Sequence, residues 1–225
     1  KIYVPIKLTY TLNDILTGNY TYDSNELALS ELWATEDIFA GDTYDNWTLG
    51  TEYTFSYDSS SGASSITGFT NAGTYSGISI DILKSGFEVA SSGNTTGSLV
   101  IDQKALTITG TTAANKVYDG TRDVTETIGT LSGFVTGETV TATTEGTFAS
   151  KDVGTRTATF EYTLADTSTG LAENYSLANT TDDADITKKA LNASLTGTIK
   201  KEYDGTKASV LTSANYSLSG FIGDE

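Results

Sequence analysis

The sequence contains no His, no Cys and no Met, and only one Pro among its 225 residues. Without His or Cys, the chain cannot form a Ser-His-Asp or Cys-His nucleophile, an imidazole general base or a disulfide. The zinc, copper, haem and iron–sulfur sites that depend on these side chains are excluded with them. A metal would have to be a hard cation held by oxygen, and calcium is the candidate.

The chain also has few positive charges, with 13 Lys and Arg against 29 Asp and Glu and a net charge of −16. Nucleic-acid binding needs clusters of Lys and Arg, and the densest here are the pairs Lys188-Lys189 and Lys200-Lys201. No apolar run approaches the roughly 18 residues of a membrane span. We therefore expect no nucleic-acid partner, no membrane insertion, and an acidic surface that keeps neighbouring copies soluble.

Apolar and polar residues alternate with a period of two along much of the chain, which predicts half-buried strands and an all-β fold. The clearest runs are Ile2–Leu8, Tyr53–Tyr57, Ile78–Ile82 and Thr157–Leu164. Residues 25–39 are ambiguous, because Leu29, Leu32 and Trp33 could form one helical stripe or belong to two strands. The β pattern on both sides favours the non-helical alternative.

An internal repeat divides the sequence. Lys104-Ala105-Leu106 recurs as Lys189-Ala190-Leu191, and Tyr118-Asp119-Gly120-Thr121 recurs as Tyr203-Asp204-Gly205-Thr206, both at an offset of 85 residues. A period of this length is too long for a solenoid unit and suits a small β-sandwich domain.

The repeat predicts three segments, 1–103, 104–188 and 189–225, because an apolar strand precedes Lys-Ala-Leu at both boundaries. The third segment is too short to bury a core of its own, and with no initiator Met we expect the chain to be an internal piece of a longer one. Linkers are almost absent, so we expect tandem, immunoglobulin-like β-sandwich domains in a rod-like array.

Segment 104–188 contains the runs Lys104-Ala105-Leu106-Thr107-Ile108-Thr109, Asn115-Lys116-Val117-Tyr118-Asp119-Gly120-Thr121, Leu131-Ser132-Gly133-Phe134, Gly137-Glu138, Gly146-Thr147-Phe148, Lys151-Asp152-Val153-Gly154 and Glu173-Asn174-Tyr175-Ser176-Leu177. Through these runs it resembles the YDG domain of large bacterial surface proteins. Segment 189–225 is similar to the first part of a second copy, with Leu218-Ser219-Gly220-Phe221 repeated and Gly223-Asp224 matched to Gly137-Glu138.

Segment 1–103 contains the runs Tyr20-Thr21-Tyr22-Asp23, Leu49-Gly50-Thr51-Glu52-Tyr53-Thr54, Asn71-Ala72-Gly73-Thr74-Tyr75 and Gly97-Ser98-Leu99-Val100-Ile101. Through these runs it is similar to the MBG-type, bacterial immunoglobulin-like repeat. It departs from the pattern at Ser24, where Gly usually follows Tyr-Asp, and residues 25–47 resemble an insertion.

Together the resemblances imply a structural stalk of a secreted or cell-surface bacterial adhesin, which extends a binding tip or builds extracellular matrix or filaments. They imply no catalytic residue, and we expect no enzyme activity. The implied partners are neighbouring repeats of the same chain, host or matrix glycans or proteins, or like chains.

The repeated turn has a structural interpretation. Gly120 and Gly205 can adopt a positive φ, and Asp119 and Asp204 can accept hydrogen bonds from backbone N–H groups two residues on. We expect Tyr118 and Tyr203 to be packing anchors that cap the ends of their cores, with hydroxyl groups that reach backbone atoms.

Two sets of side chains are candidates for binding. Asp182, Asp183 and Asp185 are predicted just before the last strand of segment 104–188, where calcium would stiffen a junction; the alternative is a solvated acidic turn. Trp33, Tyr44 and Trp47 lie in the apparent insertion and could form a glycan-stacking surface; the alternative is that both indoles fill the core. A glycan-binding module is therefore the alternative function.

Overall fold

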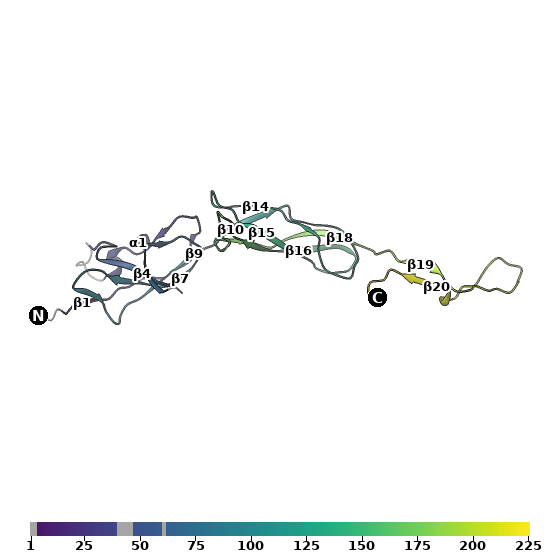
Figure 1. Cartoon of the computed structure of the whole chain (residues 1–225), viewed down its shortest axis with the longest axis horizontal. Helices are drawn as coiled ribbons and strands as arrows, with labels where there is room; N and C mark the ends of the chain where they lie inside the picture. The colour runs from purple at the N-terminus through teal and green to yellow at the C-terminus, as the bar shows by residue number, and fades with distance from the viewer. Residues whose placement is uncertain (1–3, 40–46, 60–61) are drawn as a thin grey trace. The chain divides into compact units, whose positions relative to one another are not determined.

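The computed structural model describes residues 4–39, 47–59 and 62–225, which are built mainly of β-strands, so the all-β prediction is confirmed (Figure 1). The chain divides into two compact units. The first comprises Lys1–Thr107, Leu131–Ala142 and Leu164–Ala178, and the second comprises Ile108–Thr130, Thr143–Thr163 and Asn179–Glu225. Residues of segment 104–188 therefore belong to both compact units. The boundaries at residues 103/104 and 188/189, which come from the sequence repeat, remain a prediction.

A five-stranded sheet is the largest element of the first unit. Its strands, in spatial order, are β2 (Ile15–Thr21), β9 (Gly97–Asp102), β7 (Gly73–Ile82), β4 (Tyr53–Ser59) and β5 (Gly62–Ile66). β2 runs parallel to β9 and the other neighbours are antiparallel. Alternate residues of β9, namely Gly97, Leu99 and Ile101, are buried, as period-two patterning requires.

Smaller sheets complete the first unit. β1 (Ile6–Leu8) pairs in parallel with β8 (Phe87–Val89), and β3 (Leu27–Ala28) pairs with β6 (Gly68–Phe69). A three-stranded sheet in the order β14 (Thr130–Ser132), β10 (Lys104–Thr109), β17 (Tyr175–Leu177) lies mostly in this unit. β17 follows a 3-10 turn at Ala172–Asn174.

The non-helical prediction for residues 25–39 is wrong in part, because two short helices form there, α1 (Leu29–Leu32) and α2 (Thr35–Ile38). The backbone N–H of Trp33 donates to the Leu29 carbonyl at 3.0 Å, which closes one helical turn. Leu29 and Trp33 are both buried, so the i, i+4 spacing puts both side chains on the core side of that turn. Tertiary burial therefore outweighed the surrounding β pattern.

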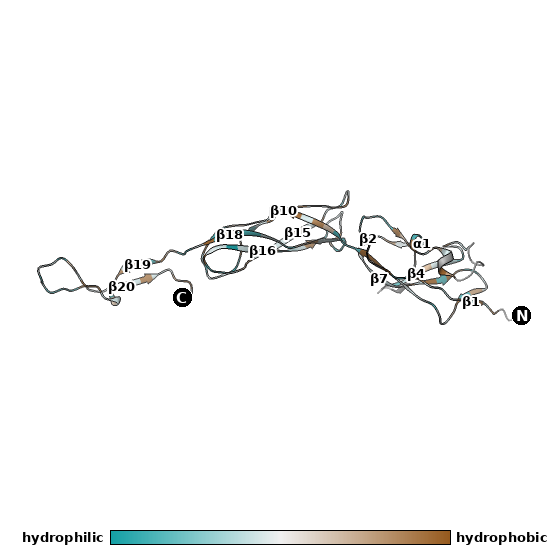
Figure 2. Ribbon diagram, turned by 180° about the vertical axis from the view of Figure 1, so that it is seen from behind, coloured by the Kyte–Doolittle hydropathy of each residue, from teal (hydrophilic) through white to brown (hydrophobic). Residues whose placement is uncertain are grey.

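The second unit contains a four-stranded sheet in the order β12 (Lys116–Val117), β18 (Thr180–Thr187), β16 (Gly154–Ala165), β15 (Thr141–Phe148). Its core consists of Phe148, Ala158, Phe160, Ala184 and Ile186. The opposite face is polar, and Figure 2 shows hydrophilic residues along much of β16 and β18. The alternation predicted for Thr157–Leu164 is therefore confirmed.

Short pairings account for the remaining strands of this unit. β11 (Thr112–Ala113) pairs with β13 (Glu126–Thr127), and β19 (Asn192–Leu195) pairs antiparallel with β20 (Tyr216–Ser219), which follows a 3-10 turn at Ser213–Asn215. Every residue of segment 189–225 is at least partly exposed to solvent. Among the described residues, no helix has the length and apolar character needed to cross a bilayer.

Candidate functional sites: the Tyr-Asp turns and the buried interface of the first unit

The Tyr-Asp-Gly turn at residues 118–120 has the predicted backbone. Asp119 Oδ1 accepts hydrogen bonds from the Thr121 N–H at 2.9 Å and the Thr121 hydroxyl at 3.0 Å, and Gly120 adopts φ +80°. A side chain at this φ would be strained, so the backbone conformation alone favours Gly at this position.

Lys116 closes this turn, a role that our sequence reasoning missed. Its ammonium lies 2.9 Å from Asp119 Oδ1 and donates to the carbonyl oxygens of Thr121 at 3.1 Å and Asp123 at 2.9 Å. The Lys116 hydrogen bond, followed by the Thr121 backbone N–H, lowers the pKa of Asp119 to about 2. The available signal was the Lys three residues before the Asp, which recurs at Lys201 before Asp204.

The copy at residues 203–205 has the same local geometry. Asp204 Oδ1 accepts from the Thr206 N–H at 2.9 Å, the Lys201 ammonium lies 2.7 Å from it, and Gly205 adopts φ +76°. Hydrogen bonds from Lys201 and then Thr206 lower the pKa of Asp204.

The first segment contains a third version of the turn. Asp23 Oδ1 accepts from the Asn25 N–H at 2.9 Å, and Ser24 adopts φ +68° in the place of the glycine. Hydrogen bonds from Asn25 lower the pKa of Asp23. The Tyr22-Asp23-Ser24 turn is thus the structural counterpart of the two Tyr-Asp-Gly turns, although it carries a serine at the strained position.

The two tyrosines of the repeated motif differ from each other. Tyr118 packs partly buried against the core that contains Phe148, but its hydroxyl donates to the Glu225 carboxylate and not to a backbone atom. Tyr203 is 98% exposed, so the expectation that it is a packing anchor is wrong. The physical reason is that segment 189–225 has no buried residue for the ring to pack against.

Asp182, Asp183 and Asp185 lie inside β18 and not in a turn before it. Successive strand residues point to opposite faces, so Asp182 faces away from the other two. Asp182 accepts from the Ala113 N–H at 3.0 Å, while Asp183 and Asp185 accept from the hydroxyls of Thr157 at 2.7 Å and Thr155 at 2.6 Å.

The three carboxylates therefore do not converge on one cation, and no group of three or more potential acidic ligands gathers anywhere in the described ranges. Asp183 and Asp185 are instead members of a cross-strand ladder with β16, in which each pairs with the threonine directly opposite. Such polar pairs stabilise the register of adjacent strands.

Trp33 and Trp47 are 3% and 8% exposed, so neither indole offers a face for a sugar ring to stack on. Trp33 Nε1 donates to the Asn13 carbonyl at 3.1 Å, and the Trp47 ring packs edge-on against Phe87 at 5.2 Å between centroids. Tyr44, the third candidate, lies outside the described residues. The structure thus favours the alternative in which the indoles fill the core.

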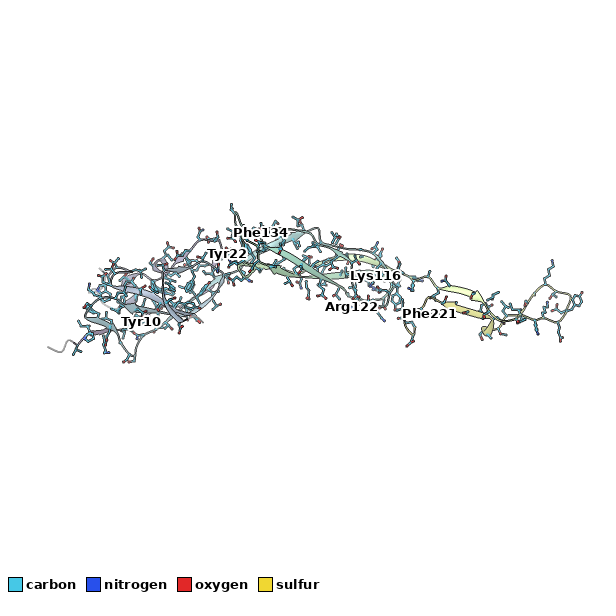
Figure 3. All side chains as sticks on the ribbon, in the orientation of Figure 1. Tyr10, Tyr22, Lys116, Arg122, Phe134 and Phe221 are labelled. Atoms are coloured by element: carbon cyan, nitrogen blue, oxygen red, sulfur yellow. The ribbon has the colours of Figure 1, made fainter. Side chains whose placement is uncertain are left out.

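A tyrosine–carboxylate cluster lies inside the first unit, where segment 1–103 meets residues of segment 104–188 (Figure 3, near Tyr22 and Phe134). Glu138 accepts hydrogen bonds from the Tyr22 hydroxyl at 2.6 Å and the Tyr175 hydroxyl at 2.8 Å. The two tyrosine rings pack edge to face at 5.6 Å, and Phe134 packs edge-on against Tyr175 at 5.9 Å. Burial, reinforced by the hydrogen bond to Glu138, raises the pKa of Tyr22 well above its ordinary value, and burial also raises that of Tyr175.

A buried asparagine supports the same interface. Asn174, which is 1% exposed, accepts from the Ala72 N–H at 2.8 Å and donates to the Asn71 side-chain oxygen at 3.1 Å. A buried amide without hydrogen-bond partners lowers the stability of the fold. Because both partners of Asn174 lie in segment 1–103, separating Asn174 from that segment would carry this cost.

The apolar core of the first unit is continuous across the same boundary. Its buried members include Leu99 and Ile101 from β9 together with Leu106, Val140 and Tyr175 from segment 104–188. Only Gln103 separates β9 from β10, and its side-chain amide donates to the Glu173 carbonyl at 2.9 Å. Segments 1–103 and 104–188 are therefore connected by one residue, by shared apolar burial and by buried polar pairs.

In a comparison with protein families, residues 102–182 match the YDG domain. No curated protein and no solved structure matches the chain. The MBG-type repeat at residues 1–103 stays a prediction. Residues 102–182, which contain the Tyr118-Asp119-Gly120 turn and Glu138, are a YDG domain.

Proposed function

We propose that the chain is a structural stalk region of a secreted or cell-surface bacterial adhesin, in which tandem immunoglobulin-like β-sandwich repeats hold a binding tip away from the cell or build extracellular matrix. In this proposal the working parts are the joints between repeats and the polar sheet surfaces. Its partners are neighbouring repeats of the same chain.

The observation that carries the proposal is the continuous core of the first unit across the β9–β10 connection. A flexible tether would separate the repeats by a long polar linker, whereas one residue, Gln103, separates these strands. Burial shared by two repeats lets each one stiffen the other, as a stalk requires.

The surface chemistry agrees with this role. The net charge of −16 opposes association between neighbouring copies, and hydroxyl–carboxylate pairs such as Thr157–Asp183 cover the exposed side of β16 and β18. The turns and the tyrosine–carboxylate cluster consist of hydrogen bonds and packing contacts within the fold, which is what a structural role requires.

Single-molecule force spectroscopy on the full chain, held between two marker domains of known unfolding length, tests the mechanical function. We expect a discrete unfolding event for the YDG repeat that releases about 280–300 Å, the extended length of an 85-residue segment. Gradual extension at low force, without such an event, would contradict a mechanical role.

Surface proteolysis of cells that express the full-length protein tests the location. We expect externally added protease to remove the segment from intact cells. Protection from the protease until the cells are lysed would contradict the cell-surface part of the proposal.

A further inference from the structure

The Tyr22 turn lies at the point where the last strand of the first segment ends. The Tyr22 N–H donates to the Asp102 carbonyl at 2.9 Å, at the end of β9, and its hydroxyl reaches Glu138 in the following repeat. The tyrosine therefore binds its own repeat through the backbone and the next repeat through the side chain.

The Tyr118 turn has the same two contacts one repeat later. The Tyr118 N–H donates to the Thr187 carbonyl at 2.8 Å, at the end of β18, and its hydroxyl donates to Glu225. The hydrogen bond to Glu225 raises the pKa of Tyr118.

The two acceptor carboxylates are equivalent by position and by local fold. Glu138 and Glu225 each lie seven residues after the leucine of a Leu-Ser-Gly-Phe run. The glycines of those runs, Gly133 and Gly220, adopt φ +98° and +99°. A Cβ on Gly133 would lie 3.4 Å from the Ala105 carbonyl oxygen, and a Cβ on Gly220 would lie 3.3 Å from the Ala190 carbonyl oxygen. The structural counterpart of Glu138 is thus Glu225, whereas the matched Gly-Asp pair predicted Asp224.

Apolar contacts surround the second tyrosine–carboxylate pair. Tyr118 and Val153 line a groove together with Leu191, Phe221 and Ile222 from the following segment. A Cβ on Gly120 would lie only 2.9 Å from Ile222 Cγ2, so the turn and the incoming segment are closely fitted.

We propose that the tyrosine of the Tyr-Asp turn is a docking residue, which receives the Leu-Ser-Gly-Phe segment and the following glutamate of the next repeat. The chemistry suits this task, because a phenol donates a strong hydrogen bond to a carboxylate while its ring covers apolar side chains. By the same rule, the exposed Tyr203 turn would offer the same contacts to a Leu-Ser-Gly-Phe segment. The inference rests on the proposed stalk function and specifies how one repeat recognises the next.

Amide hydrogen exchange on the full chain tests the proposal at the second pair. We expect Tyr118→Phe to accelerate exchange in β20 about 5-fold or more, because the docked segment loses a hydrogen bond to a charged group. Tyr203→Phe is the matched control, since it removes the same hydroxyl from the same turn where the ring is 98% exposed, and it should change nothing.

A double-mutant cycle supplies the second measurement. Glu225→Gln alone should lower the pKa of Tyr118, which can be measured from the NMR shift of a Tyr118 ring carbon during a pH titration. The double variant Tyr118→Phe with Glu225→Gln should accelerate amide exchange no more than the stronger of the two single variants. Tyr22→Phe and Glu138→Gln should behave likewise at the first pair, with exchange measured in β9 and β10.

Unchanged exchange in β20 for Tyr118→Phe, an equal effect of Tyr203→Phe, or additive effects in the cycle would overturn the docking role. The proposed function would survive that result if force spectroscopy still gave discrete unfolding events. Conversely, a coupled cycle with gradual low-force extension would retain the docking role and reject the stalk.

Discussion

The Tyr-Asp-Gly turn at residues 118–120 and its copy at 203–205 have the same hydrogen bonds and φ values of +80° and +76°, yet their surroundings differ. The first turn packs on a core that contains Phe148 and Phe160, whereas the ring of the second is 98% exposed. Local chemistry is therefore sufficient to form the turn, and Asp, Gly and the preceding Lys close it without a core. Long-range packing is needed only for the tyrosine, which contacts a core at residue 118 and is exposed at residue 203.

The largest expected difference between the two copies is in their aromatic side chains. Phe160→Ala should lower the free energy of unfolding by about 3–5 kcal/mol, because Phe160 is fully buried and its loss leaves a cavity. Phe221→Ala, at a ring that is 46% exposed, should cost less than about 1 kcal/mol. Urea unfolding of both variants measures the contrast, and equal losses would show that Phe221 is packed as tightly as Phe160.

The glycines of the two turns separate strain from packing. Gly120→Val should destabilise the second unit by about 2–3 kcal/mol, because it combines strain at φ +80° with a contact at 2.9 Å to Ile222. Gly205→Val has the same strain but no atom within 4 Å of the new Cβ, in a segment without buried residues. The main thermal transition of the Gly205→Val variant should be unchanged. An unaffected melting temperature for Gly120→Val would show that neither strain at this φ nor the contact to Ile222 destabilises the second unit.

This contrast also explains what the sequence could predict. Strand alternation and the Asx-type turn are set by neighbours in the chain, so the strand at Thr157–Leu164 and the geometry of Asp119–Thr121 were predictable from residue order. The Glu225 partner of Tyr118 was not, since it lies 107 residues away and depends on how one segment docks.

The binding candidates failed for a related reason. Asp182, Asp183 and Asp185 are close in sequence, but successive side chains of β18 point to opposite faces of the sheet, so the three carboxylates are separated. Burial of Trp33 depends on the helical turn α1, and a single-sequence pattern could not choose that turn over a strand. Closeness in sequence therefore predicts the Tyr-Asp-Gly turn, whose contacts are local. It does not predict a binding site, which needs several side chains on one face of the fold.

The smallest expected effect concerns the carboxylates of the turns. The pKa of Asp119 is about 2 in the folded chain and lies below its ordinary value of 3.8, so the folded state favours the ionised form. Its stabilising contribution is complete above about pH 5 and is lost as the pH falls through 2. Because the side chain is about half exposed, solvent screening limits this contribution to less than about 1 kcal/mol.

Asp119→Asn measures that contribution. The variant should be slightly less stable than the parent chain at pH 6, and the gap should narrow as the pH approaches 2, because the parent carboxyl then becomes neutral as well. Asp204→Asn is the control: the same ion pair is present, but the turn supports no core, so thermal unfolding of the second unit should be the same as in the parent at both pH values. A gap for Asp119→Asn that stays constant from pH 6 to 2 would mean that the turn is held by its shape and not by the charge on Asp119.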